Sequence, residues 1–286
     1  MKPKLSLLAL SLAAFLSSCT KYEAVGYDGG AASSTDGATA PTADATAMPD
    51  APWGEDHFDA APSVDAMPPN LSCMGIADPT TAVDPLVLSG SIMDLVSKSG
   101  IDGAAMEAFQ ISDDALLASG ATMADGTFSL SIPTGGTALD AYAKASKAGY
   151  ADTYFFPGYP TAMGASGLQL VMAAPDQVGF IYLLGGVARQ EGTATALTVV
   201  VDCAGQFVKG AQVALDPPAG KIAYLREGTT AIDSTSTETA SDGVAIGMNV
   251  PVSTDMTLSA TWNGHAFRSH KIKTRANAVV LTIIHP

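Results

Sequence analysis

Residues 124–133 read Ala-Asp-Gly-Thr-Phe-Ser-Leu-Ser-Ile-Pro, and this stretch has the pattern of a turn followed by a β-strand. The Asp-Gly pair is a turn signal, because glycine supplies the positive φ that tight turns need. The Phe, Leu and Ile that follow alternate with serines, so the apolar side chains share one face, as in a half-buried β-strand. The final proline closes the strand, since it has no N–H for a β-ladder.

The same pattern recurs between residues 86 and 285. Short alternating runs of Val, Ile, Leu, Thr, Phe and Tyr are separated by Gly, Pro, Asp and Asn, which is typical of antiparallel sandwiches. Asn263-Gly264 is the strongest hairpin signal, because a type I′ turn needs positive φ at both central residues. The expected strands are 86–92, 105–111, 116–122, 128–132, 139–146, 197–201, 212–215, 244–250, 256–262, 266–273 and 278–285.

Turn landmarks repeat between the two halves of this region. Asp125-Gly126 corresponds to Asp242-Gly243, and Ile132-Pro133 to Val250-Pro251. The spacing is longer in the second half, which an extra loop around 220–234 would explain. We therefore expect an all-β chain with two tandem antiparallel β-sandwiches.

We place the first sandwich at 73–174 and the second at 194–286, with a connecting segment at 175–193. Pro175 at a first turn and Gly185 after the last favour a short helix at the start of this segment. We expect its apolar face to wedge between the two sandwiches.

Several landmarks resemble the carboxypeptidase regulatory-like family of transthyretin-like, Ig-like sandwiches. The matching motifs are Ser89-Gly90, Gly103-Ala104, residues 124–128 and Gly149-Tyr150. The likeness is good over 86–151 and looser over 194–286, where the hairpin aromatic and the Gly-Tyr pair are missing. The resemblance implies accessory modules that stabilise, space or dock neighbouring domains, and some related sandwiches bind carbohydrate.

Residues 1–19 resemble a bacterial lipoprotein signal peptide. Two lysines precede an apolar run at 5–16, which is too short to span a bilayer as a helix. Leu16-Ser17-Ser18-Cys19 resembles a lipobox, which implies that Cys19 is acylated and becomes the mature N-terminus. By analogy with Gram-negative sorting, Thr20 favours the outer membrane. The alternative is an ordinary cleaved signal in which Cys19 is incidental.

Residues 20–72 have the composition of a disordered tether. They consist mainly of Ala, Asp, Gly, Ser, Thr and Pro, with nine acidic residues against Lys21. Such a segment buries too little apolar surface to offset its ordering entropy. We expect it to lift the folded body from a membrane and to be repelled by anionic headgroups.

The composition excludes some functions. The chain has 286 residues, a net charge of −14 and 15% charged residues. Acidic residues outnumber basic ones by 28 to 14, so no basic surplus is available to neutralise phosphates, and we expect no nucleic-acid partner. The expected partners are the membrane, through the lipid at Cys19, and a protein or polysaccharide.

Two cysteines remain once Cys19 is assigned to lipidation. In an exported protein, Cys73 and Cys203 favour one disulfide. The alternative is two unrelated thiols. We expect no metal site here, because no third ligand lies near either cysteine in the sequence.

Aromatic residues are densest between Gly149 and Pro160. The candidate binding surface comprises Tyr154, Phe155, Phe156, Tyr159 and, beside the expected hairpin, Trp262. Aromatic side chains could stack on sugar rings or anchor a protein partner. The alternative, which we favour, is that part of the segment is core and the rest covers a seam between domains.

We find no credible catalytic residue and expect no cofactor. His265 and His270 lie on one expected strand at an odd spacing, so they should point to opposite faces. Asp113-Asp114 fits a solvated turn, because adjacent side chains diverge.

The sequence thus favours a non-catalytic, envelope-anchored lipoprotein with structural, adhesive or docking roles. The alternative is a carbohydrate-binding module. A metal-dependent enzyme like the intradiol dioxygenases, whose fold is similar, is a third reading and requires His265 and His270 to converge with tyrosines.

Overall fold

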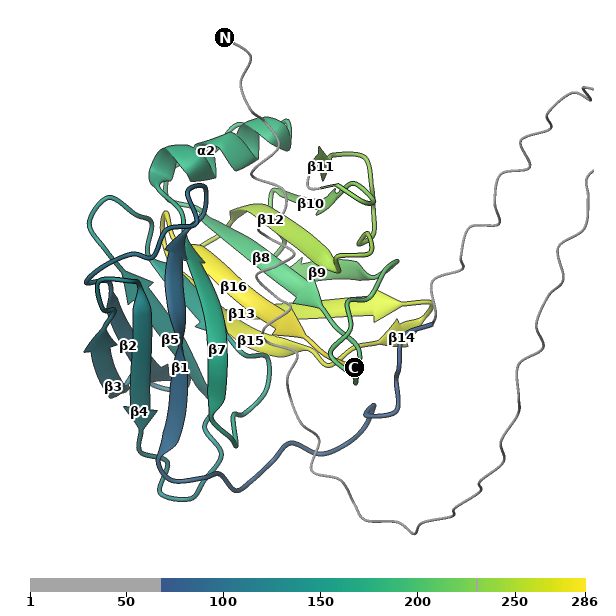
Figure 1. The fold of residues 1–286 in the computed structure, drawn as a ribbon. Coiled ribbons are helices and arrows are strands. Elements are labelled where there is room, and N and C mark those ends of the chain that lie inside the picture. The colour runs from purple at the N-terminus through teal and green to yellow at the C-terminus, as the bar shows by residue number, and fades with distance from the viewer. Residues whose placement is uncertain (1–67, 230) are drawn as a thin grey trace, which may run out of the picture. The chain divides into compact units, whose positions relative to one another are not determined.

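A computed structural model describes residues 68–229 and 231–286, which are almost entirely β (Figure 1). The signal peptide, Cys19 and most of the expected tether lie outside the described residues. The first half contains β1 (Leu86–Asp94), β2 (Ala105–Gln110), β3 (Leu116–Ala121), β4 (Thr127–Ile132), β5 (Ala141–Ser146), β6 (Thr153–Phe156) and β7 (Ala165–Met172). The second half contains α2 (Pro175–Leu184), β8 (Ala194–Val200), β9 (Gln212–Asp216), β10 (Lys221–Leu225), β11 (Ile232–Asp233), β12 (Val244–Val250), β13 (Ser253–Trp262), β14 (His265–Ala266), β15 (His270–Thr274) and β16 (Val279–Ile284). The expected all-β class is confirmed.

The strands form three sheets. One has nine strands in the order β11-β10-β12-β8-β16-β6-β5-β2-β3, and a second has three in the order β4-β1-β7. The third contains β14, β13 and β15, with β9 also paired to β13. The pairing is not purely antiparallel as expected, because β1 pairs in parallel with β7, and β16 in parallel with β6 and β8.

The nine-stranded sheet joins the two halves of the chain. Its link is the parallel pair β6 and β16, in which Thr153 lies opposite Val279 and Phe156 opposite Thr282. The expected boundaries at 73–174, 175–193 and 194–286 fall between elements, yet the sheet continues across them. The aromatic segment therefore includes a strand inside this sheet, which the sequence pattern did not predict.

Each face of the nine-stranded sheet is covered by a different core. Val279 and Leu281 of β16 point into a cluster with β1, β4 and β7, whereas Val280 and Ile284 point into a cluster with β9, β13 and β15. Strands buried on both faces read as nearly continuous apolar runs, and β8, β12 and β16 do so. The chain is thus two sandwiches that share a sheet.

Helix α2 begins and ends at the residues expected from the sequence. Val178, Ile181 and Tyr182 are buried in the same cluster as residues of both halves. The Tyr182 hydroxyl accepts a hydrogen bond from the Asn249 N–H at 2.9 Å, which fastens the helix to the end of β12. The packing of these buried side chains thus outweighs the helix-propensity cost of Gly179 in the middle of the helix.

Two differences from the expected strands have topological causes. Residues 220–234 are not simply an extra loop, because β10 pairs with β12 there. The expected strand 266–273 is broken into β14 and β15, since Arg268 donates its N–H to the His285 carbonyl instead. The turn at Asn263-Gly264 is present, with φ values of 45° and 81°, and it joins β13 to β14.

Candidate functional site

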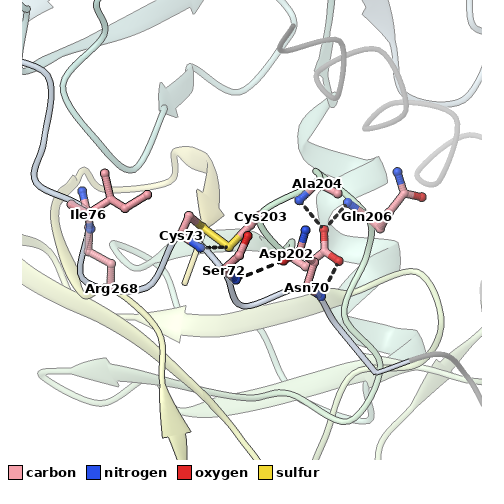
Figure 2. The surroundings of a disulfide bond; sticks show 9 residues. All are labelled: Asn70, Ser72, Cys73, Ile76, Asp202, Cys203, Ala204, Gln206 and Arg268. Atoms are coloured by element: carbon pink, nitrogen blue, oxygen red, sulfur yellow. Dashed lines mark hydrogen bonds between the residues drawn. A yellow bond between two sulfur atoms is a disulfide. The ribbon is translucent and has the colours of Figure 1, made fainter. Parts of the chain in front are cut away.

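A strap formed by residues 70–78 fastens the beginning of the described chain to the second half. Cys73 and Cys203 form a disulfide with Cα atoms 5.6 Å apart, which confirms the expected pairing (Figure 2). The Asn70 N–H donates to Asp202 Oδ2, and the Asn70 carbonyl accepts from the Cys203 N–H, both at 2.9 Å. The last residues assigned to the tether are therefore held in place.

The far end of the strap is fastened by Arg268. Its guanidinium donates to the Ile76 carbonyl and forms an ion pair with Asp78. Arg268 lies between β14 and β15, so the strap passes over the point where the expected strand 266–273 is broken. After the strap, the chain continues to β1 in the first half.

A pocket of about 220 Å³ lies beside this end of the strap. Its walls include Asp78, residues 156–160 from the end of β6 and the loop after it, and residues 268–271. Asp140 also lines it, and burial raises the pKa of this carboxyl. The pocket therefore combines charged side chains of both signs with aromatic and proline surface.

Gly158 allows the loop after β6 to approach β16. A Cβ atom at this position would lie 2.2 Å from the Ile283 carbonyl oxygen, and the backbone φ is +85°. Only glycine satisfies both conditions without strain. The neighbouring Tyr159 ring consequently lies edge-on against His285, with ring centroids 4.7 Å apart.

His270 and His285 form the least usual feature of the site. His270 Nε2 is 2.7 Å from Thr282 Oγ1, and His285 is hydrogen-bonded to the Pro157 backbone. The remaining ring nitrogens, Nδ1 of His270 and Nε2 of His285, are buried and have no hydrogen-bond partner among the described residues.

Burial lowers the pKa of both imidazoles to about 4. Interaction with His285 lowers the pKa of His270 further, and the Arg268 charge acts on His285 in the same direction. The hydrogen bond to the Pro157 carbonyl opposes these effects at His285. Both rings are therefore neutral at neutral pH.

The histidine pair named from the sequence does not come together. His265 is exposed on β14, where its ring stacks on Trp262 with centroids 6.3 Å apart, whereas His270 is on β15. The expectation that they share one strand is wrong, because the chain leaves the sheet between them. His285 was not singled out from the sequence, because its place beside residues 268–270 arises only where Arg268 donates to the His285 carbonyl and His270 bonds Thr282.

The candidate binding aromatics are largely covered. Tyr154 and Phe156 are buried, with 8% and 0% of their surface exposed, so they present no external surface. Phe155, Tyr159 and Trp262 are partly exposed. The Trp262 indole donates to the Lys209 carbonyl at 2.9 Å, which holds the ring against the neighbouring turn.

Asp114 ties the two halves together, rather than lying in a merely solvated turn as expected. It accepts hydrogen bonds from the Tyr142 hydroxyl at 2.9 Å and from Lys273 Nζ at 2.6 Å, and it pairs with Arg275 at 3.2 Å. The Lys273 hydrogen bond is the main cause that lowers the pKa of Asp114. Asp113, by contrast, accepts only a local bond from the Ala115 N–H in the same turn.

We expect Asp114→Asn to lower the free energy of unfolding by about 1–2 kcal/mol. Breaking a fully buried ion pair costs more, but the Asp114 side chain is 40% exposed and solvent screens the loss. Asparagine retains the positive φ of 58° at this position. The measurement is urea unfolding, with Asp113→Asn as the matched control. Equal stability of the two variants would contradict a stabilising contact between Asp114 and the second half of the chain.

Within the described residues, no group of three or more His, Cys, Asp or Glu side chains is arranged to hold a metal ion. Among the same residues, no helix has the length and apolar character needed to cross a bilayer.

Comparisons with known proteins identify no family. No family model matches the chain, and neither does any curated protein. Among solved structures, the shaft pilin SpaA of Lactobacillus rhamnosus GG is 13% identical, with 71% of this chain and 97% of the pilin covered and a TM-score of 0.22.

Two other structures are similarly distant. The TIE protein of Bacillus anthracis is 11% identical at a TM-score of 0.22, over 69% of this chain and only 33% of its own length. The 3-chlorocatechol 1,2-dioxygenase of Rhodococcus opacus 1CP is 14% identical at a TM-score of 0.24, over 40% and 70%. At these scores the likenesses assign no function.

Proposed function

We propose that this chain is a non-catalytic lipoprotein of the cell envelope, in which two fused β-sandwiches serve a structural, adhesive or partner-docking role. Its anchor is the lipid on Cys19, and its place is the outer membrane. The support at the N-terminus is the lipobox-like stretch that ends at Cys19, followed by an acidic segment of tether composition.

The strap is the structural observation that carries this proposal. Where the tether composition ends, Asn70 and Cys73 are fastened to the loop after β8. A pull on the N-terminal segment would therefore act first on the disulfide and on β8, which is an interior strand of the nine-stranded sheet. Without the disulfide, the same pull would pass along the strap to Arg268, which holds Ile76 and Asp78, before it reached β1.

The two other readings receive less support. A carbohydrate-binding module needs exposed aromatic rings in a row, whereas Tyr154 and Phe156 are buried. A dioxygenase-like enzyme was expected to need convergence of His265 with His270, and His265 lies exposed beside Trp262 instead. The first observation gives no support to a carbohydrate-binding face, and the second gives none to a dioxygenase-like site.

Cys19→Ala is the direct test of the anchor. In cells fed an alkyne-labelled fatty acid, the unchanged protein is expected to take up label and to fractionate with the outer membrane, because acyl chains give stable anchoring. Cys19→Ala is expected to lose both properties.

The matched control is Cys203→Ser, which removes another cysteine and should leave the labelling intact. Label on Cys19→Ala, or no label on the unchanged protein in a host that processes lipoproteins, would contradict the proposal.

A further inference from the structure

The pocket beside the strap is lined by charged side chains that are unequally compensated. Its two basic residues are both engaged: Arg268 pairs with Asp78 on the strap, and Lys271 Nζ lies 2.6 Å from Asp255 Oδ1. The Asp140 side chain forms no hydrogen bond or ion pair with any residue that the structure describes. Among the described residues that line the pocket, Asp140 therefore holds the one carboxylate without a cationic partner.

The backbone around Asp140 is held in place by hydrogen bonds. The Ile111 N–H donates to the Asp140 carbonyl at 2.9 Å, and Leu139 forms an antiparallel bridge with Thr161. These bonds fix the residue before β5 between the end of β2 and the loop after β6. A support that is already ordered lowers the entropy cost of binding a ligand.

The surroundings of Asp140 favour a positively charged ligand. The residue is exposed, so a ligand can reach it, yet partial burial of its carboxyl raises the pKa and thus disfavours the charged form. A cationic hydrogen-bond donor would offset this cost, because charge-assisted bonds are stronger than neutral ones. The net charge of the chain, −14, also attracts cations and repels anions.

The other walls of the pocket suit the apolar stem of such a cation. Phe156 and Tyr159 contribute aromatic surface, and Pro157 and Pro160 contribute apolar surface. Aromatic rings attract ammonium groups, and the methylenes of a lysine side chain bury along apolar surface while the charged head stays at a polar site. The volume of about 220 Å³ is below that of pockets for drug-sized ligands, about 300–1,000 Å³, and suits a single side chain.

We propose that this pocket binds the alkylammonium group of a lysine side chain from a partner protein, with the Asp140 carboxylate as its ion-pair partner. The inference rests on the docking role proposed above and names the chemistry of the partner. Its test is separate from that of the lipid anchor, because acylation of Cys19 does not involve the pocket.

Titration with Nα-acetyl-lysine methylamide, followed by ¹H–¹⁵N NMR, tests this proposal because the method detects weak binding. The protein is the full chain carrying Cys19→Ala, so that no lipid is attached. We expect saturable shifts of the Gly158 and Ser269 amides, which belong to the pocket lining. Asp140→Asn is expected to weaken binding by about tenfold or more, the size of effect that loss of a hydrogen bond to a charged group has.

The chain supplies a matched control variant. Asp102 is also an exposed carboxylate, but it lies outside the pocket lining. Asp102→Asn makes the same change of charge as Asp140→Asn and is expected to bind the probe like the parent chain. Equal binding by the two variants would overturn the proposal, because the loss would then have no link to the pocket.

A second measurement changes the probe instead of the protein and covers the case in which Asp140→Asn fails to fold. The Nε-acetylated form of the same probe keeps the methylene stem but carries no charge, and it is expected to bind at least about tenfold more weakly. Equal binding of the two probes, or the absence of saturable shifts with the charged one, would overturn the proposal. Saturable shifts with glucose but not with the lysine probe would assign the pocket to carbohydrate instead.

Discussion

The double variant Cys73→Ser/Cys203→Ser is expected to lose about 2–5 kcal/mol of unfolding free energy. The two cysteines are 130 residues apart, and a cross-link over so long a loop removes roughly 5 kcal/mol of entropy from the unfolded chain in the simple chain model. Measured losses of native disulfides run somewhat lower, which sets the lower end of the range. Urea unfolding under oxidising conditions measures the difference.

Reduction of the unchanged protein is the internal check on this number. With the disulfide reduced, the unchanged protein should approach the stability of the double variant, and Cys19→Ala should match the unchanged protein in both conditions. Hydrogen exchange should rise first in the strap, because Asn70 and Cys73 lose the contact that orders them. Identical unfolding midpoints with and without reductant would refute the stabilising role.

Acid is expected to destabilise the protein through His270 and His285. The pKa of each ring is about 4 in the folded chain and 6.5 in the unfolded chain. Between these values the unfolded chain binds more protons, so stability is fully present above pH 6.5 and is lost as pH falls toward 4. At 1.36 kcal/mol per pKa unit, one ring accounts for about 3 kcal/mol of this loss.

The measurement is the free energy of unfolding as a function of pH. His270→Gln is expected to flatten the curve between pH 6.5 and 4, whereas His265→Gln should leave its slope unchanged, since His265 is exposed. Asp114 acts at lower pH: its lowered pKa means that its contribution is lost only as the folded-state carboxylate becomes protonated. A pH profile that is flat above 4 would contradict the buried-imidazole account.

The candidate site was partly visible in the sequence. The Cys73 and Cys203 pairing followed from cysteine number and export, and it is present. The hydrogen bond of His270 with Thr282 on β16 could not be found in the same way, because periodicity states which face of a strand a residue occupies but not which strand faces it. Asp114 is a similar case, since its partners Lys273 and Arg275 come from the other half of the chain.

The aromatic segment shows how one pattern can have two structural causes. Tyr154 and Phe156 were candidates for a surface because aromatic residues cluster there. In the structure they lie on β6, whose pairing with β16 joins the two halves of the sheet. An interior strand buried on both faces has no polar side to alternate with, so its residues resemble a binding patch until its neighbours are known.

Local chemistry along the chain was enough to determine the all-β class, most strands, helix α2 and the turn at Asn263-Gly264, because alternation, proline and positive-φ residues act within a few neighbouring positions. Three features arise only in three dimensions: the sheet that the two sandwiches share, the position of Asp78 at the wall of a pocket, and the hydrogen bond between His270 and Thr282. The physical reason is that parallel pairing and face-to-face packing bring together residues far apart in sequence, and neither leaves a periodic mark on the chain.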